Sequence, residues 1–302
     1  MKVLIVARCK KGEYAPFIKE QVNALLTQGI EVEYFAIHSG RIRGYIKEWP
    51  RLKKNIKIYK PDIIHAHYGL SGLLANLQRK VPVVTTYHGS DINLPNVFRL
   101  SKIAVRLSRF NIFVSQKNLE KVSPTGSFAL IPCGINLNDF PDIEKEEARK
   151  ILNLKLGRKY ILFAGAFDNP IKNAPLAQSA VNRIEGVELL ELKGYTRREV
   201  NFLLHAVDAL LMTSFSEGSP QIIKEALACG CPIVSVDVGD VSEMIRGVEG
   251  CYIAERKTAT ITSLVKEAIS FGRQTSGREV IVEKGLTNDL IASKLISIYR
   301  SV

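Results

Sequence analysis

The densest group of residues that could carry chemistry runs from Ser214 to Pro232, with the sequence SFSEGSPQIIKEALACGCP. Two carboxylates in it, Glu217 and Glu225, are separated by seven residues. The segment follows an apolar run and opens an expected helix, whose first backbone N–H groups lack partners within the helix. Such N–H groups at the carboxyl edge of a sheet suit a phosphate or sugar hydroxyls. The segment therefore predicts a site for an extended, phosphate-bearing ligand.

The small residues between the two carboxylates fit this interpretation. Gly218 allows a ligand to approach the backbone closely, and Pro220 suits a first helical position, where no N–H is needed. An ordinary capped helix is the alternative, with the negative charge of Glu217 interacting favourably with the helix dipole and Glu225 on a solvated face. Both interpretations stay open at the level of this segment.

The elements that would position these residues alternate between strand and helix along the whole chain. Expected strands cover residues 2–7, 31–37, 63–66, 81–87, 112–114, 160–164, 187–191, 209–212 and 233–236, and helices cover 16–28, 71–78, 144–152 and 221–229. This alternation is typical of parallel, doubly wound sheets with ligands at the carboxyl ends of the strands. At 302 residues the chain suits two domains. We predict an α/β protein with two Rossmann-like domains facing across a cleft, residues 1–139 and 140–287.

Several segments together resemble one known family. Glu217–Glu225 resembles the Glu-x7-Glu signature of retaining glycosyltransferases of family 4, which have the GT-B fold. Further segments match that family's pattern in the same order over almost the whole chain: Thr86–Asp91, Ile131–Asn136, Ala228–Ser235 and Val238–Glu243. The resemblance also implies that a final helix, within residues 288–302, packs back onto the first domain.

The resemblance assigns catalytic roles to three residues. It implies that Glu217 holds hydroxyls of the donor sugar and that Lys172 stabilises the leaving diphosphate, where negative charge develops. It implies that His88 faces the donor sugar from the other domain. Each has an ordinary alternative, since a lone Lys is commonly a surface residue and His88 could be a structural histidine.

The resemblance also implies a set of donor-binding residues, with Glu225 on the ribose and Gly12 near the diphosphate. The full set is Gly218, Ser219, Pro220, Glu225, Gly12 and Gly165. Tyr14, His65 and His67 could line the acceptor cleft, although side chains at strand ends often pack inside instead.

One departure from the family pattern concerns the diphosphate. The family commonly has an arginine shortly after the first strand of its second domain, where this chain has Ala166. Either Arg197 or Arg8 substitutes for it, or phosphate binding is weaker or rearranged.

The positive charge is confined to the first half of the chain. Residues 1–140 contain 21 Lys and Arg against 9 Asp and Glu, a net charge of +12, whereas the remainder contains 21 of each sign. Such asymmetry indicates an anionic partner or simply a soluble basic surface. No recognition motif or stacking aromatic pattern accompanies it, so we expect no nucleic-acid partner.

Residues 41–60 hold eight of these cations and one acidic residue, with apolar residues at near-helical spacing. A basic amphipathic helix with Tyr and Trp predicts an anionic membrane surface or a docking site for a lipid-phosphate acceptor. The alternative is a helix that covers the sheet with its apolar stripe inward. We expect the acceptor or membrane face to include Arg41, Arg43, Lys47, Trp49, Lys53 and Lys54.

The expected location and cofactor use of the protein rest on two kinds of segment that the sequence does not contain, a membrane span and a metal-binding cluster of carboxylates. No apolar stretch approaches the ~20 residues of a membrane span, and five scattered cysteines fit reduced thiols in the cytosol. We expect a cytoplasmic protein, peripheral on the inner face of the membrane. No Asp-x-Asp cluster is available to hold a metal, so we expect no metal and no cofactor besides the donor substrate.

The resemblance implies a retaining transferase that moves a hexose from a UDP- or GDP-sugar to a glycan or lipid-linked acceptor, in surface polysaccharide synthesis. A nucleotide-sugar epimerase of related fold is one alternative. A degenerate, non-catalytic protein that binds sugar nucleotides or glycans is another, suggested by Ala166.

Overall fold

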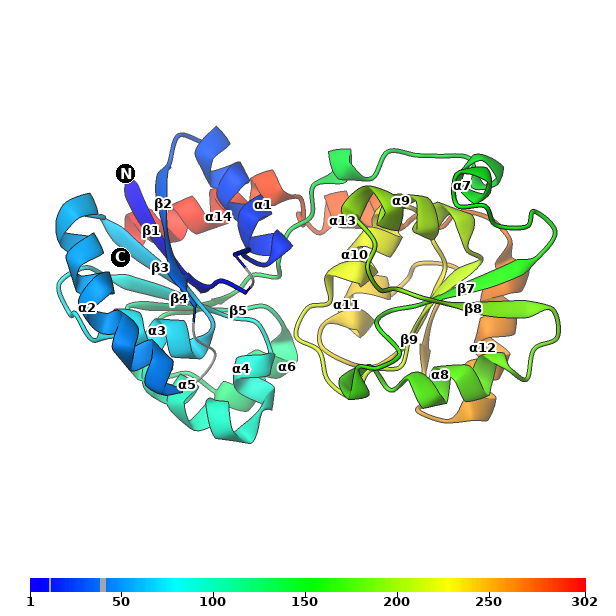
Figure 1. Ribbon diagram of the computed structural model, residues 1–302, viewed down its shortest axis with the longest axis horizontal. Helices are drawn as coiled ribbons and strands as arrows, with labels where there is room; N and C mark the ends of the chain where they lie inside the picture. The colour runs from blue at the N-terminus through cyan, green and yellow to red at the C-terminus, as the bar shows by residue number, and fades with distance from the viewer. Residues whose placement is uncertain (11, 39–41) are drawn as a thin grey trace. The chain divides into compact units, whose positions relative to one another are not determined.

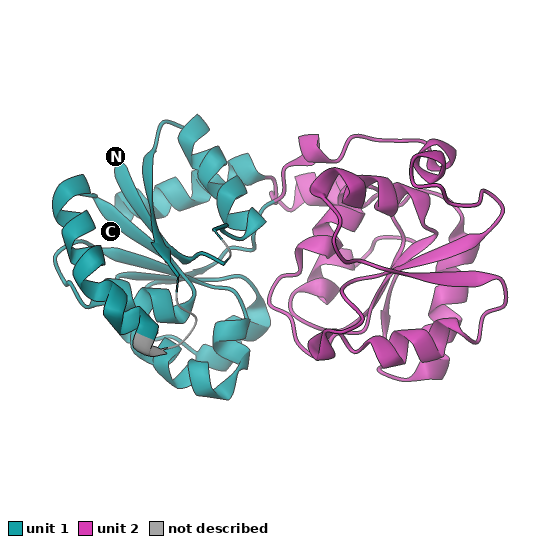
Figure 2. Cartoon of the chain, in the orientation of Figure 1, with its two compact units in different colours: residues 1–134, 288–302 teal, residues 135–287 magenta. Residues whose placement is uncertain are grey.

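The computed structural model describes residues 1–10, 12–38 and 42–302, with the side chains of residues 42 and 43 left out. The chain forms two compact units (Figures 1 and 2). Unit 1 comprises Met1–Gly134 and Asn288–Val302, and unit 2 comprises Ile135–Thr287.

Unit 1 is built on a six-stranded parallel sheet in the order β2-β1-β3-β4-β5-β6. Its strands are β1 (Lys2–Arg8), β2 (Glu31–Ile37), β3 (Ile63–His67), β4 (Val83–Tyr87), β5 (Phe110–Phe113) and β6 (Phe128–Leu130). Its helices are α1 (Pro16–Thr27), α2 (Ile42–Tyr59), α3 (Gly69–Asn76), α4 (Ser90–Asn93), α5 (Pro95–Leu107), α6 (Gln116–Val122) and α14 (Asn288–Ser301).

Both faces of this sheet are covered, and its central strands β3 and β4 are buried along their whole length. Side chains alternate between the faces along β1. Val3 and Ile5 pack with α1 and α14 on one face, whereas Leu4 and Val6 pack with α2 and α3 on the other.

Unit 2 is built on a five-stranded parallel sheet in the order β11-β10-β9-β7-β8. Its strands are β7 (Lys159–Phe163), β8 (Val187–Glu191), β9 (Ala209–Met212), β10 (Ile233–Val236) and β11 (Cys251–Ala254). Its helices are α7 (Lys145–Ile151), α8 (Ala174–Val181), α9 (Arg197–Ala206), α10 (Gln221–Ala228), α11 (Val241–Ile245), α12 (Thr258–Phe271) and α13 (Gly277–Glu283), with 3₁₀ turns at Leu137–Asp139 and Pro170–Lys172.

Each sheet has a point where the chain reverses its direction of travel across the strands. In unit 1 the chain runs from β1 to β2 on one side and then to β3 on the other. In unit 2 it runs from β7 to β8 and then to β9. Loops at the carboxyl ends of the two strands diverge at such a switch point, which is where open α/β sheets bind ligands.

The predicted fold class is confirmed, with two parallel sheets and interleaved helices. The units divide after Gly134, whereas the sequence analysis places the boundary at 139/140. Two contacts explain the difference: Ile135 N donates to Leu286 O at 2.9 Å, and Phe140 is buried in the core of unit 2.

The last helix, α14, packs on α1 in unit 1. None of the helices in the described part of the chain has both the length and the apolar character needed to cross a membrane.

Candidate functional site

Two loops meet at the switch point of unit 2, because the strands that precede them, β7 and β9, are paired. Phe215 N donates to Ile171 O at 2.8 Å, and Thr213 Oγ1 donates to Lys172 O at 3.0 Å. These bonds bring Lys172 and Glu217 together, with Nζ and Oε1 2.7 Å apart. Both side chains are largely buried, at 22% and 16% exposure, so solvent screens this ion pair only in part.

The backbone of Gly165 packs closely against the side chain of Lys172. A Cβ atom at Gly165 would lie 2.7 Å from Lys172 Cγ and 2.9 Å from Cδ. The aliphatic stem of Lys172 therefore runs directly over the backbone at Gly165, and a larger residue would displace it. Gly165 was predicted to bind the donor, and in the structure its backbone packs against the side chain of Lys172.

A buried polar network holds the turn that follows Glu217. Ser219 Oγ donates to Asp240 Oδ2 at 2.5 Å and accepts from Lys224 Nζ at 2.5 Å. Lys224 is fully buried and also donates to Gln221 Oε1 at 3.2 Å, while Asp240 is 4% exposed. Burial raises the pKa of Asp240, and the nearby charge of Lys224 opposes that effect.

Lys224 and Asp240 were not among the predicted site residues. The signal was available for Lys224, since it is a charged residue among Ile222, Ile223 and Leu227, all of which are buried. Lys is rarely buried without a partner.

Glycine is also needed beside Gly218. Gly239 has φ +55°, and any Cβ there would clash with the carbonyl oxygen of Gly218. The backbone of Gly218 is thus held by close packing. Pro220 is the N-cap of α10, with ψ 121°, and the helix begins at Gln221. This differs from the expected first helical position, because the extended ψ leaves Pro220 outside the helix.

Glu225 pairs with Arg197 at the start of α9. Arg197 Nη1 lies 3.4 Å from Glu225 Oε1, and its Nε lies 3.3 Å from Asp139 Oδ2. A capping box of Thr196 and Glu199 fixes the first turn of α9 and with it Arg197. Arg197 therefore lies beside the carboxylate expected to bind ribose, whereas Arg8 belongs to unit 1.

His88 follows β4 in unit 1 and is bonded to other side chains. Its Nε2 lies 3.0 Å from His67 Nδ1, and its Nδ1 lies 3.7 Å from Cys133 Sγ. His65 Nδ1 lies 2.6 Å from Tyr299 Oη. Burial lowers the pKa of His65, His67 and His88, so the three rings are neutral at physiological pH.

His65 and His67 are fully buried, which places them in packing. Gly12 lies in the loop after β1 with φ +85°. Both Gly12 and His88 are in unit 1, whereas the other predicted catalytic and donor residues are in unit 2.

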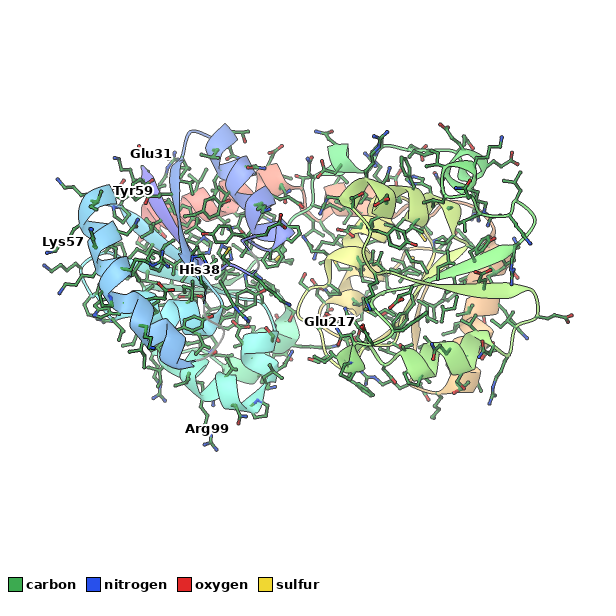
Figure 3. All side chains as sticks on the ribbon, in the orientation of Figure 1. Glu31, His38, Lys57, Tyr59, Arg99 and Glu217 are labelled. Atoms are coloured by element: carbon green, nitrogen blue, oxygen red, sulfur yellow. The ribbon has the colours of Figure 1, made fainter. Side chains whose placement is uncertain are left out.

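The basic helix α2 covers the sheet of unit 1. Tyr45 and Leu52 are buried, and Trp49 packs partly buried against the same core. Trp49 is therefore on the inner side of the helix, contrary to its expected place on a membrane face. Lys47, Lys53 and Lys54 are exposed, as is Ile46 at 63%, and Lys57 points away from the helix (Figure 3). Arg41 lies outside the described residues, and so does the side chain of Arg43.

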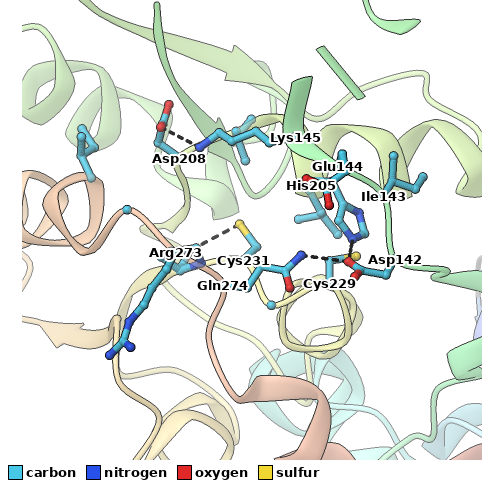
Figure 4. Close-up of a pocket in the computed structure, with 16 residues that line it drawn as sticks. Asp142, Ile143, Glu144, Lys145, His205, Asp208, Cys229, Cys231, Arg273 and Gln274 are labelled. Carbon is cyan, nitrogen blue, oxygen red and sulfur yellow. Dashed lines mark hydrogen bonds and ion pairs between the residues drawn. The ribbon is translucent and has the colours of Figure 1, made fainter. Parts of the chain in front are cut away.

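Unit 2 also contains a cavity of about 270 Å³, and none of the predicted catalytic or donor-binding residues lines it (Figure 4). Asp142 accepts from Gln274 at 2.8 Å there and lies 3.4 Å from His205 Nε2. Burial raises the pKa of Cys229 and Cys231, so both stay unreactive thiols. Across the described residues, His, Cys, Asp and Glu form no group suited to a metal ion.

Comparison with known families gives two matches. The model described as "Glycosyltransferase Family 4" matches residues 3–139, and the model described as "Glycosyl transferases group 1" matches residues 161–270. TuaC of Bacillus subtilis, a glycosyltransferase named for teichuronic acid biosynthesis, is 30% identical over 214 residues. The match covers 61% of this chain and 55% of TuaC, so the chain spans about half the length of this curated relative.

Solved structures share the fold over the whole chain. A sucrose-phosphate synthase from Thermosynechococcus elongatus has a TM-score of 0.85 at 17% identity, covering 99% of this chain and 98% of its own. HepE from Anabaena, in complex with UDP, has a TM-score of 0.78 at 16% identity, with both chains fully covered. At these identities the likeness shows a common fold.

Proposed function

The chain belongs to glycosyltransferase family 4 and has the GT-B fold, and on that premise we propose that it moves a hexose from a nucleotide-diphosphate sugar to a glycan or lipid-linked acceptor. The proposal includes retention at the anomeric carbon, through front-face displacement. HepE, which shares the fold, is solved with UDP and with UDP-glucose, and this supports a UDP- or GDP-sugar as the donor.

The observation that carries the proposal is the Lys172–Glu217 pair at the switch point of unit 2, with its atoms 2.7 Å apart. In the transfer, the acceptor oxygen forms a bond to the anomeric carbon as the bond to the diphosphate breaks. The acceptor proton passes to an oxygen of the leaving phosphate. Lys172 stabilises the negative charge that develops there, and Glu217 holds the sugar hydroxyls.

Glu225 is the proposed ribose ligand, oriented by Arg197 at 3.4 Å. Since Lys172 supplies the positive charge for the leaving group, we propose that the reaction needs no metal. We propose that His88, which belongs to unit 1, faces the donor sugar as a neutral imidazole.

The setting we propose is surface polysaccharide synthesis in the cytoplasm, with unit 1 held peripherally on an anionic membrane. The name of TuaC supports the first part. The exposed lysines on α2 support the membrane association, since each Lys near an anionic membrane surface contributes about 1 kcal/mol to the free energy of binding.

Calorimetric binding of UDP, GDP and UDP-glucose tests the donor site. Glu225→Ala should weaken binding of the preferred nucleotide about tenfold or more, because a charged hydrogen bond to ribose contributes about 1.5–3 kcal/mol. Lys172→Ala should reduce hydrolysis of the donor sugar about 10²- to 10³-fold. Lys266→Ala and Glu267→Ala, both exposed on α12, are matched controls that should change neither. Binding of no nucleotide by the wild-type chain would contradict the proposal.

Ala166 favours one second candidate, a protein that binds sugar nucleotides without transfer. It stands after β7, and the loop from 164 to 169 contains no Lys or Arg. UDP binding by the wild-type chain without any turnover of UDP-glucose, with or without acceptor sugars, would favour this candidate.

A further inference from the structure

A chain of three side chains holds the turn that follows Glu217. Lys224 Nζ donates to Ser219 Oγ at 2.5 Å, and Ser219 Oγ donates to Asp240 Oδ2 at 2.5 Å. The direction of both bonds is fixed, because an ammonium group can only donate, so the one hydrogen of the Ser219 hydroxyl goes to Asp240. The Ser219 side chain has no hydrogen left for a ligand. Any hydrogen bond that Ser219 donates to a donor sugar therefore comes from its backbone N–H.

The same chain of side chains joins two loops at the carboxyl edge of the sheet. Ser219 lies in the loop after β9 and Asp240 in the loop after β10, and these two strands are paired. The backbones of the two loops are also in close contact, because a Cβ atom at Gly239 would clash with the carbonyl oxygen of Gly218. The turn that follows Glu217 is therefore fixed against the next loop by one polar link and one backbone contact.

The loop after β9 is bonded to two further segments. Phe215 N donates to Ile171 O at 2.8 Å in the loop after β7, and Arg256 Nη2, after β11, donates to Ser214 O at 3.0 Å. Glu217 thus lies on a loop that is held from both sides before any ligand arrives. Preorganised groups of this kind act on a transition state without the cost of being ordered at the moment of reaction.

Net stability alone does not explain why this network is charged. Lys224 is fully buried and Asp240 is 4% exposed, and taking two charges out of water carries a large free-energy cost. Replacing a whole buried ion pair by apolar residues is often neutral or stabilising. Apolar residues would fill the space beside Ser219, but they would leave its hydroxyl free to rotate. The specific contribution of the charged pair is therefore a fixed orientation of Ser219.

We propose that Lys224 is a positioning residue for donor recognition, which acts through Ser219 on the turn that carries Glu217. Lys224 keeps this turn and its carboxylate in the orientation that the hydroxyls of the donor sugar require. The inference rests on the proposed transfer function, since it concerns how the donor site of that function is held. Lys224 acts without touching the donor, so its removal should affect the sugar of the donor more than the nucleotide, whose ribose is assigned to Glu225.

Calorimetric binding of UDP, UDP-glucose, GDP and GDP-mannose to the full chain tests this inference, together with hydrolysis of the two nucleotide sugars. The main variant is Lys224→Met with Asp240→Asn, which removes both charges so that neither is left buried alone. The nucleotide sugar that the wild-type chain prefers should bind at least about tenfold more weakly, and its bare nucleotide less than about threefold more weakly. The kcat for hydrolysis should fall about 10²-fold, because the sugar is misplaced.

Ser219→Ala separates positioning from direct contact with the donor. This variant removes the hydroxyl that joins Lys224 to Asp240 but leaves both charges in place. A selective loss of sugar recognition in Ser219→Ala and in the main variant alike supports positioning. A loss in Ser219→Ala alone would mean that the hydroxyl contacts the donor directly, and it would overturn the role of Lys224.

The matched control is Arg149→Met with Asp208→Asn, which removes a second buried ion pair of unit 2. Arg149 Nη2 lies 3.0 Å from Asp208 Oδ2, with the side chains 7% and 4% exposed. Asp208 directly precedes β9, at the amino end of the strand, whereas Glu217 follows its carboxyl end. The control should lower stability without changing the ratio of the two affinities, for nucleotide sugar and for bare nucleotide. If both double variants change this ratio equally, the effect is general destabilisation and the inference is overturned.

Hydrogen exchange without ligand keeps this inference distinct from the proposed function. Amides of residues 215–221 should exchange faster in the main variant than in the wild-type chain, and the control should leave them unchanged. Unchanged sugar recognition in the main variant would overturn the inference, whatever the exchange rates are. Failure of the wild-type chain to bind any nucleotide would contradict the proposed function and with it a role in donor recognition, while the exchange rates would still show whether Lys224 holds the turn.

Discussion

Lys224 and Asp240 are a buried pair of opposite charge, joined through the hydroxyl of Ser219. Removing one member of such a pair leaves the other charge buried without compensation. We expect Lys224→Met to destabilise unit 2 by about 3–5 kcal/mol at neutral pH. Thermal unfolding followed by calorimetry measures this loss.

The loss should depend on pH with a definite sign. Burial raises the pKa of Asp240 above the ordinary value of an Asp carboxyl, so the folded state holds that proton more firmly than the unfolded state. Stability linked to this group is therefore highest at low pH and falls as pH rises through the raised pKa. Without Lys224 the pKa of Asp240 should rise further, and the loss from Lys224→Met should shrink as pH is lowered toward the ordinary pKa of an Asp carboxyl. Adding Asp240→Asn to the variant should restore part of the stability at neutral pH. A loss that is independent of pH would show that Asp240 is not the charge left uncompensated.

At the scale of single residues, the sequence could predict which residues belong to the site, but it could not predict most of the residues that they contact. Glu217 and Glu225 are visible from their spacing and the helix start, whereas Lys172 and its role came from the family resemblance. The contact between Lys172 and Glu217 depends on β7 pairing with β9, which the chain reaches only after passing through β8. The same is true of Arg197 and Glu225, which lie on different helices. These contacts join segments that are far apart in the sequence, so the local sequence around each residue could not predict them.

At the scale of elements, the structure of α2 confirms that its apolar stripe packs on the sheet, while membrane binding by its outer side stays a prediction. Its apolar stripe covers the sheet through Tyr45, Leu52 and partly Trp49. The register of the helix on the sheet decides which of its large residues face inward. Periodicity alone could place Trp49 on the stripe, but it could not tell whether the stripe faced the core or a membrane.

The outward lysines of α2 lead to a prediction about membranes. Lys47→Gln, Lys53→Gln and Lys54→Gln together should weaken binding to anionic phospholipid vesicles about 10²-fold, at about 1 kcal/mol per charge. Binding should also weaken as salt is raised. Co-sedimentation with vesicles of anionic or of neutral lipid measures both effects.

The control removes the same charge elsewhere in unit 1, with Lys2→Gln, Lys80→Gln and Arg109→Gln, all from exposed or half-exposed positions. This variant should bind nearly as the wild type does. Equal losses in the two variants would assign the effect to net charge, and binding to neutral vesicles would exclude an electrostatic origin.

Several elements were absent from the sequence analysis for a physical reason. β6 and β11 are edge strands of three and four residues, and β6 leaves Phe128 and Leu130 exposed. Short edge strands bury little, so their hydrophobic pattern is weak. The buried strands β1, β3 and β4 were found because both of their faces are covered by helices.

At the scale of the whole molecule, the chain completes unit 1 only at its last helix. α14 follows all of unit 2 in sequence, and yet Ile291, Leu295 and Tyr299 are buried in the core that includes α1 and β1. The bond from Tyr299 Oη to His65 Nδ1 links this helix to the histidines behind His88. Unit 1 thus depends on contacts of very long sequence separation.

Leu295→Ala tests this dependence, with Leu290→Ala as a matched control on the same helix. Leu295 is 1% exposed and Leu290 is 46% exposed. Truncating the buried residue should cost unit 1 about 2–5 kcal/mol, because it leaves a cavity, whereas the exposed one should change stability by less than about 0.5 kcal/mol. Hydrogen exchange locates the loss. Amides of β1 and β3 should lose protection in Leu295→Ala, while amides of β7 and β9 keep theirs. Equal loss in both sheets would mean that the two units unfold as one cooperative body, and no loss in β1 would mean that α14 does not contribute to the stability of unit 1.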